Sequence, residues 1–290
     1  LAAYPFGGAT GRFGYPSAAL RVRALAARAD VVPAGRSVSE IDRTHGTGLS
    51  ERVPVMMGME LTFAPPRFAV LQRRLVSGID QRVAWRAMLS AGGLLDAMNV
   101  DLLVGPSGRI EQFQSSGMSP LGPTGSRRML YRNDDRIGEA WVTYGARAVK
   151  SPEQALERVL SPEFDPRVEV IVEAPLSNRY RKRALQPPTQ AQVRRASPTQ
   201  VDVEVETSQA GILVLADTWY PGWEASVDNR PADILRVNYV LRGVELTAGH
   251  HPIHFEYRPA SLRYGLAATS VGLFVALVLF GVRTRPDGRA

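Results

Sequence analysis

The sequence predicts a mixed α/β domain over residues 1–173, then a small antiparallel β-sandwich and one C-terminal transmembrane helix. Three observations lead to this fold class. Helical patterns run directly into apolar strand patterns in the first half of the chain. Apolar and charged residues alternate over short segments between residues 200 and 259. The last apolar stretch, from Tyr264 to Val282, contains no charged side chain.

The α/β prediction depends on two segments that contain helices. A helical pattern over Gln81–Met98 ends near Asn99, and Val100–Val104 follows at once as an apolar strand. The sequence Ser-Pro-Glu at 151–153 indicates a helix start, because Ser caps the helix, Pro fits its first position and the acid lies in its first turn. The chain begins at Leu1 within a Gly- and Ala-rich loop, so we expect this domain to be truncated at its N-terminus.

The β-sandwich prediction covers residues 200–259 and follows a predicted linker. Residues 174–199 are polar and basic and contain four prolines, which favours a linker between domains. Strand patterns then recur at close spacing, with turn residues between them. They are Val201–Val205, Gly211–Ala216, Trp223–Val227, Val237–Leu246 and Ile253–Tyr257.

The transmembrane prediction covers residues 262–282. The uncharged stretch of 19 residues would extend about 28 Å as a helix, close to the thickness of a bilayer's hydrocarbon core. Arg283 and Arg285 follow it directly and begin a short tail at 283–290. The alternative is a buried helix of a soluble protein, which usually keeps a polar face.

Composition excludes several functions. The net charge is +7, but basic and acidic residues alternate along most of the chain, which argues against a nucleic-acid partner. The chain has no cysteine, which excludes disulfides and thiolate chemistry. It contains no phosphate-binding loop, nucleophile elbow or zinc-protease motif, so we expect no cofactor and no catalytic residue within it.

Three histidines near the end of the predicted sandwich invite comparison with a metal site. His250 and His254 share one face of a strand but stand about 13 Å apart, whereas His251 points to the other face. Such a spacing does not converge on one zinc ion. We therefore expect no metal site here, and interpret these histidines as surface residues of a hairpin.

The most specific motif is an aromatic turn, Asp-Thr-Trp-Tyr-Pro-Gly-Trp at 217–223. It is followed by Arg236-x-Asn238-Tyr239, by Ala-Gly-His at 248–250 and by Phe-x-Tyr-Arg-Pro at 255–259. This order resembles the C-terminal portion of YfhO-like bacterial membrane proteins. Residues 94–100 and 130–142 extend the resemblance upstream, although Gly138-Glu139 stands where the family usually has Pro-Arg.

The resemblance implies a large polytopic protein similar to the GT-C glycosyltransferases, which use polyprenyl-phosphate-linked sugars in cell-envelope glycosylation. It implies a bacterial cytoplasmic membrane location, with residues 1–260 on the extracytoplasmic side and 283–290 in the cytoplasm. The family's catalytic acid lies in an early loop that this chain lacks, so the chain would position substrate without cleaving a bond. Membrane lipid, a polyprenyl-phosphate sugar and an envelope glycan acceptor are the partners implied.

Five residues of the motif are candidates for contact with sugar or lipid. They are Trp219, Tyr220, Trp223, Asn238 and Tyr239. Aromatic rings offer flat faces to sugars and amphipathic edges to lipid headgroups. The alternative is that the aromatics only pack a bulky turn between two strands, in a membrane-anchored envelope module without enzymatic activity.

Overall fold

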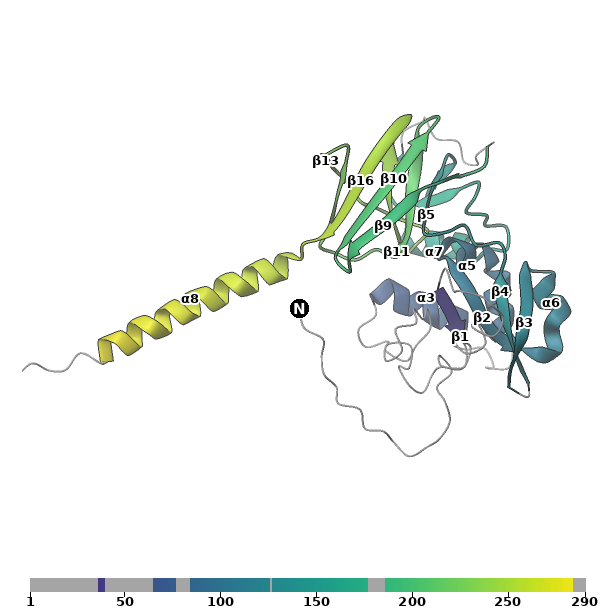
Figure 1. Ribbon diagram of the computed structural model, residues 1–290, viewed down its shortest axis with the longest axis horizontal. Helices are drawn as coiled ribbons and strands as arrows, with labels where there is room; N and C mark the ends of the chain where they lie inside the picture. The colour runs from purple at the N-terminus through teal and green to yellow at the C-terminus, as the bar shows by residue number, and fades with distance from the viewer. Residues whose placement is uncertain (1–35, 40–64, 77–83, 126, 177–185, 284–290) are drawn as a thin grey trace, which may run out of the picture. The chain divides into compact units, whose positions relative to one another are not determined.

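The computed structural model describes residues 36–39, 65–76, 84–125, 127–176 and 186–283 (Figure 1). The predicted tail and most of the N-terminal part of the predicted α/β domain lie outside these residues. The chain divides into two compact units. The first contains Leu1–Ala64, Gln72–Leu89 and Val100–Arg136, and the second contains Pro65–Leu71, Ser90–Asn99 and Ile137–Ala290.

The first unit is built on a four-stranded sheet in the order β1-β2-β4-β3. Strand β1 pairs with β2 in parallel, and the other two pairs are antiparallel. Phe113 stacks on Tyr131 with 4.0 Å between ring centroids, which fixes helix α6 on this sheet. The elements are β1 (Arg36–Ser39), α4 (Ala84–Ser90), β2 (Val100–Pro106), η1 (Ser107–Arg109), α6 (Ile110–Gln114), β3 (Met118–Gly125) and β4 (Arg128–Asn133).

The second unit contains a seven-stranded sheet in the order β6-β7-β14-β15-β11-β5-β8. Its neighbouring strands are antiparallel except for β6 and β7. The strands are β5 (Ala140–Thr143), β6 (Ala146–Ala148), β7 (Val170–Val172), β8 (Thr189–Gln190), β11 (Gly211–Thr218), β14 (Leu235–Val237) and β15 (Leu241–Leu246).

A five-stranded, fully antiparallel sheet in the order β13-β12-β16-β10-β9 completes the strands of this unit. Its strands are β9 (Gln192–Ser197), β10 (Gln200–Thr207), β12 (Trp223–Val227), β13 (Arg230–Ala232) and β16 (Gly249–Tyr257). The predicted antiparallel pairing of this region is confirmed.

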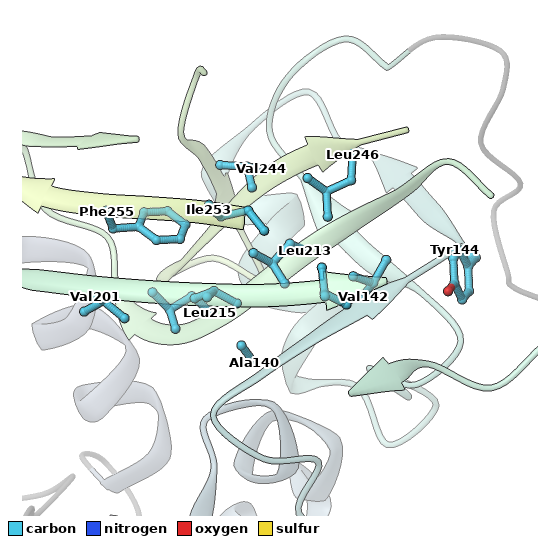
Figure 2. Close-up of a cluster of buried hydrophobic side chains, with 12 residues drawn as sticks. Ala140, Val142, Tyr144, Val201, Leu213, Leu215, Val244, Leu246, Ile253 and Phe255 are labelled. Carbon is cyan, nitrogen blue, oxygen red and sulfur yellow. The ribbon is translucent and has the colours of Figure 1, made fainter. Parts of the chain in front are cut away.

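The two sheets contribute side chains to one hydrophobic core (Figure 2). Along β10, Val201, Val203 and Val205 are buried while the acids between them are not, as the alternating sequence predicts. Strand β11 is buried on both faces over Gly211–Ala216, which explains its continuous apolar run. Phe255 of β16 is fully buried in the same core.

Besides the C-terminal helix described below, the second unit contains α5 (Gly92–Ala97), α7 (Pro152–Leu160) and the part of α3 (Pro66–Val76) that ends at Leu71. Helix α7 begins where the sequence predicts, since Ser151 Oγ accepts a hydrogen bond from Gln154 N. Gly93 of α5 lies against the Phe164 carbonyl oxygen, only 2.0 Å from where a Cβ would stand. Only glycine fits at that position.

The prediction of a linker over 174–199 is wrong for the second half of this range, which contains strands β8 and β9. Strand β8 pairs with β5 in the seven-stranded sheet, and β9 pairs with β10 in the five-stranded sheet. Strands β5 and β7 also join the sheet of β11, although the sequence placed them in the earlier domain. These pairings bring together segments far apart in the chain, and local residue patterns do not encode them.

Helix α8 (Ala260–Arg283, yellow in Figure 1) follows β16 and contains the uncharged stretch. Among the residues that the structure describes, no helix meets the combined requirements of length and apolar character for crossing a membrane. The predicted transmembrane helix therefore stays a prediction.

Candidate functional site

The aromatic turn at 219–223 joins β11 to β12 and is fixed at Gly222. This glycine has φ +97°, and its carbonyl accepts a hydrogen bond of 2.6 Å from Arg258 N. A Cβ added to Gly222 would lie 3.0 Å from the Cα of Pro259. Glycine is required here both by the left-handed backbone and by the close approach of the segment after β16.

A pocket of about 380 Å³ lies beside this turn, within the second unit. Three separate segments line it: the start of α3, the end of β11 with the aromatic turn, and the chain around β14. The lining residues are Pro65, Pro66, Arg67, Phe68, Thr218, Trp219, Tyr220, Pro221, Arg236, Tyr239 and Val240. Its volume is in the range of small-molecule sites, which is about 300–1,000 Å³.

Trp219 and Arg236 form the central contact of the pocket. The Arg236 guanidinium carbon lies 3.8 Å from the centroid of the Trp219 ring. Trp219 is itself fixed, since its backbone N–H donates to the Val240 carbonyl at 2.6 Å. Burial, and then the charge of Arg67, lower the pKa of Arg236, while Glu173 opposes this decrease. A guanidinium titrates so far above neutral pH that Arg236 remains a cation.

Tyr239 and Arg67 lie next to each other in the lining of the pocket. Arg67 is paired with Glu173, and its guanidinium carbon lies 5.5 Å from the centroid of the Tyr239 ring. Burial raises the pKa of the Tyr239 hydroxyl, so this group is protonated at neutral pH. Tyr220 remains 45% exposed, which makes it the accessible aromatic of the turn.

Two consecutive left-handed residues shape the chain after β14. Asn238 has φ +46° and Tyr239 has φ +70°. The Asn238 amide oxygen accepts from Ile171 N at 2.9 Å, and its backbone N–H donates to the Ile171 carbonyl at 2.8 Å. These bonds hold the segment against β7, while Arg236 and Tyr239 on either side reach the pocket.

The structure therefore brings together three of the five candidates, Trp219, Tyr220 and Tyr239. Asn238 is fully buried and does not line the pocket, because its amide is used by the backbone of β7. Trp223 does not line it either: its ring packs on the Arg242 guanidinium at 3.8 Å and against the two-sheet core. For these two residues the structure supports a packing role.

The interpretation of the histidines needs one correction. His251 is buried, and its Nδ1 forms a hydrogen bond of 2.9 Å with Asp228 Oδ2. Asp228 lies in the turn between β12 and β13, and strand spacing alone does not predict its contact with His251. Within the described part of the chain, no group of three or more potential ligands could hold a metal ion.

Sequence reasoning missed the charged residues of the pocket. Arg236 belongs to the motif that was recognised, but its neighbours Asn238 and Tyr239 were chosen instead. Arg67 and Phe68 lie about 150 residues before the aromatic turn in the sequence. The Pro65-Pro66 pair gives a helix start but carries no sign of a partner on β14.

Comparison with known families identifies the region that carries this pocket. Residues 173–269 match the family described as bacterial membrane protein YfhO. This region is YfhO-like. The match contains the aromatic turn and β14, so the resemblance drawn from these motifs is confirmed for this part of the chain. The membrane location predicted for this chain agrees with the description of the family as a membrane protein.

Comparison with individual proteins adds little. No curated protein matches the chain significantly. Two solved structures of the arabinofuranosyltransferase AftD from Mycobacteria, one of them a mutant, share 21% and 22% identity with it at TM-scores of 0.27 and 0.28. The matches cover 34% and 36% of this chain but only 8% and 9% of AftD. At these TM-scores the likeness supports no conclusion about fold or function.

Proposed function

We propose that this chain is the C-terminal extracytoplasmic region of a polytopic membrane protein resembling the GT-C glycosyltransferases. Its pocket would position a glycan, or the sugar of a polyprenyl-phosphate donor, for a reaction catalysed elsewhere in the protein. The observation that carries the proposal is the pocket itself. Four aromatic residues, one of them well exposed, line a hollow of about 380 Å³ together with two arginines.

The chemistry of the pocket favours binding over bond cleavage. Its titratable side chains are two arginines and two tyrosines, and the lining includes no carboxylate or histidine that could act as a general base at neutral pH. Glu173 pairs with Arg67 and is therefore engaged as a counter-ion. Aromatic rings and planar hydrogen-bond donors are suited to orienting a sugar ring.

Helix α8 is proposed to be the last membrane span. Val271, Leu273, Phe274 and Leu277 are 61–68% exposed, so these side chains are not packed against the rest of the chain. Apolar residues exposed in this number fit a lipid environment better than water. The membrane lipid would then be the first partner of this helix, and residues 1–260 would lie outside the cytoplasm.

Binding can be tested with the complete 290-residue chain in detergent. Glycan-array binding and saturation-transfer NMR should reveal contact between oligosaccharides and the pocket, and Tyr220→Ala should weaken it about tenfold, as when a ring contact of about 1.4 kcal/mol is removed. Tyr264→Ala is the matched control, because Tyr264 is an exposed tyrosine outside the pocket. Failure of every glycan to bind would favour the non-enzymatic envelope module.

Orientation can be tested separately because the chain has no cysteine. A single Asp233→Cys substitution places a thiol at an exposed position between β13 and β14. A membrane-impermeant maleimide should label it in intact spheroplasts. Labelling that requires lysis of the spheroplasts would overturn the extracytoplasmic placement.

A further inference from the structure

We infer that the pocket selects a sugar carrying an anionic group, with Arg236 as the residue that binds the anion. The ligand class is a sugar phosphate or an acidic sugar, two sources of the same recognition element, an anion with two oxygen acceptors. This inference rests on the proposed function, because it assigns the ligand of the same pocket. It depends on the charge balance, the orientation of Arg236 and the state of Tyr239.

The charges that line the pocket do not balance. Arg67 is neutralised by its ion pair with Glu173. Among the described residues, Arg236 forms no ion pair, and its contact is with the neutral ring of Trp219. One uncompensated positive charge therefore lies in a half-buried site, where it is less screened than at an open surface.

Stacking on Trp219 prepares Arg236 for such a ligand. At 3.8 Å the guanidinium covers the ring, and the hydrogen bond from Trp219 N to the Val240 carbonyl holds the Trp219 backbone in place. A stacked guanidinium keeps its N–H groups at its edges, free to donate two parallel hydrogen bonds to a phosphate or carboxylate. The side chain is thus ordered before the ligand arrives, which lowers the entropic cost of binding.

Tyr239 supplies a second donor. The residue is more than nine-tenths buried yet lines the pocket, and no other described residue forms a hydrogen bond with its hydroxyl. A hydroxyl at the pocket lining without a protein partner can donate its hydrogen to a ligand oxygen. Because burial raises its pKa, the group is a donor at neutral pH.

The start of α3 agrees with an anionic ligand. Residues Pro65–Phe68 line the pocket, and the first turn of this 11-residue helix contains no acidic side chain. The positive end of the helix dipole thus adds to the field of Arg236. The volume of about 380 Å³ has room for a monosaccharide and one anionic group.

The test compares four probes by isothermal titration calorimetry on the complete chain in detergent. These are methyl α-glucopyranoside, glucose 1-phosphate, glucuronate and inorganic phosphate. We expect at least one anionic sugar to bind about tenfold or more tightly than the neutral glycoside, as for a gained charge-assisted hydrogen bond. The phosphate and carboxylate sugars distinguish the two sources of the anion.

Three variants assign the effect to named groups. Arg236→Gln should remove the preference for the anionic sugar, Arg236→Lys should keep part of it, and Tyr239→Phe should reduce it without changing the fold. Arg230→Gln is the matched control, since Arg230 is exposed on β13 and outside the pocket. Circular dichroism of each variant checks that it is folded.

The outcomes separate this inference from the proposed function. Equal binding of neutral and anionic sugars, unchanged in Arg236→Gln, would overturn the anionic ligand while leaving a glycan site. Inorganic phosphate binding as tightly as glucose 1-phosphate would leave the anion site but refute the role of the sugar ring. No binding by any probe would overturn both.

Discussion

Two arginine–tryptophan pairs flank the aromatic turn, and each has its guanidinium carbon 3.8 Å from a ring centroid. Arg242 on Trp223 is 3% exposed and donates to Asp217 Oδ2 at 2.8 Å, and Arg195 binds the same carboxylate at 3.0 Å. Arg236 on Trp219 is half-buried, lines the pocket and has no ion pair among the described residues. The same local contact thus lies within a buried ion-pair network in one place and beside a pocket in the other.

The largest expected effect is a loss of stability when the buried arginine of the Arg242–Trp223 pair is replaced. Arg242→Met should reduce the free energy of unfolding by about 3 kcal/mol, because one partner of a buried ion pair is removed. Urea unfolding of the complete chain in detergent measures the change. Arg230→Met on exposed β13 should stay within about 0.5 kcal/mol, as surface substitutions do. Equal effects of the two substitutions would show that the Arg242 pair is not structural.

The turn between the pairs should be nearly as sensitive. Gly222→Ala forces a side chain into a left-handed backbone and toward Pro259, so we expect a loss of about 2 kcal/mol. Thermal unfolding followed by circular dichroism measures it. Gly92→Ala is the control, since a Cβ there meets no atom within 4 Å. A tolerated Gly222→Ala would mean that the segment after β16 moves away easily.

A smaller effect is expected at the pocket pair. Arg236→Gln should change the free energy of unfolding by only about 0.5 kcal/mol, the value of an exposed cation–π contact. The same urea titration used for Arg242 gives a direct comparison. A loss as large as that of Arg242→Met would place Arg236 in the framework and weaken its assignment to a ligand.

The smallest effect concerns an exposed pair at the end of β16. The hydrogen bond from Arg258 holds the pKa of Glu256 below its usual value. Such a group contributes stability above the pKa of the unfolded chain, about 4.3, and this contribution is lost as pH falls through the lower folded pKa. The stability difference between wild type and Glu256→Gln should therefore shrink on acidification below about pH 4.3. A difference that is constant with pH would exclude this linkage.

Local patterns predicted much of the fold around these pairs. The alternation at Val201–Val205 and the apolar run at Gly211–Ala216 correctly predicted β10 and β11. Burial of one face of a strand requires alternating apolar residues, and burial of both faces requires a continuous apolar run. Ser151 and Pro152 likewise fixed the start of α7. Long-range partners were not predictable: nothing in Ala140–Thr143 indicates that this strand pairs with β11.

The lining of the pocket was predicted in part for the same reason. Trp219, Tyr220 and Tyr239 lie near one another in the sequence and line one pocket, while their contact with a ligand stays a prediction. Asn238 was chosen with them, but its amide bonds to a strand that the motif does not contain. Arg67 reaches the pocket from a distant helix, and only the folded structure brings it there.

The pairing of β5 with β11 also determines when this unit can fold. Trp141 of β5 pairs with Val214 of β11, which lies far later in the sequence. Strand β5 therefore leaves the ribosome long before its partner strand is made. Until then its backbone donors and acceptors have no sheet neighbour on that side, and such edges attract foreign strands. Topologies dominated by distant pairings fold slowly, on a scale of about milliseconds to seconds. Protection of this nascent strand during synthesis should therefore raise the yield of folded protein.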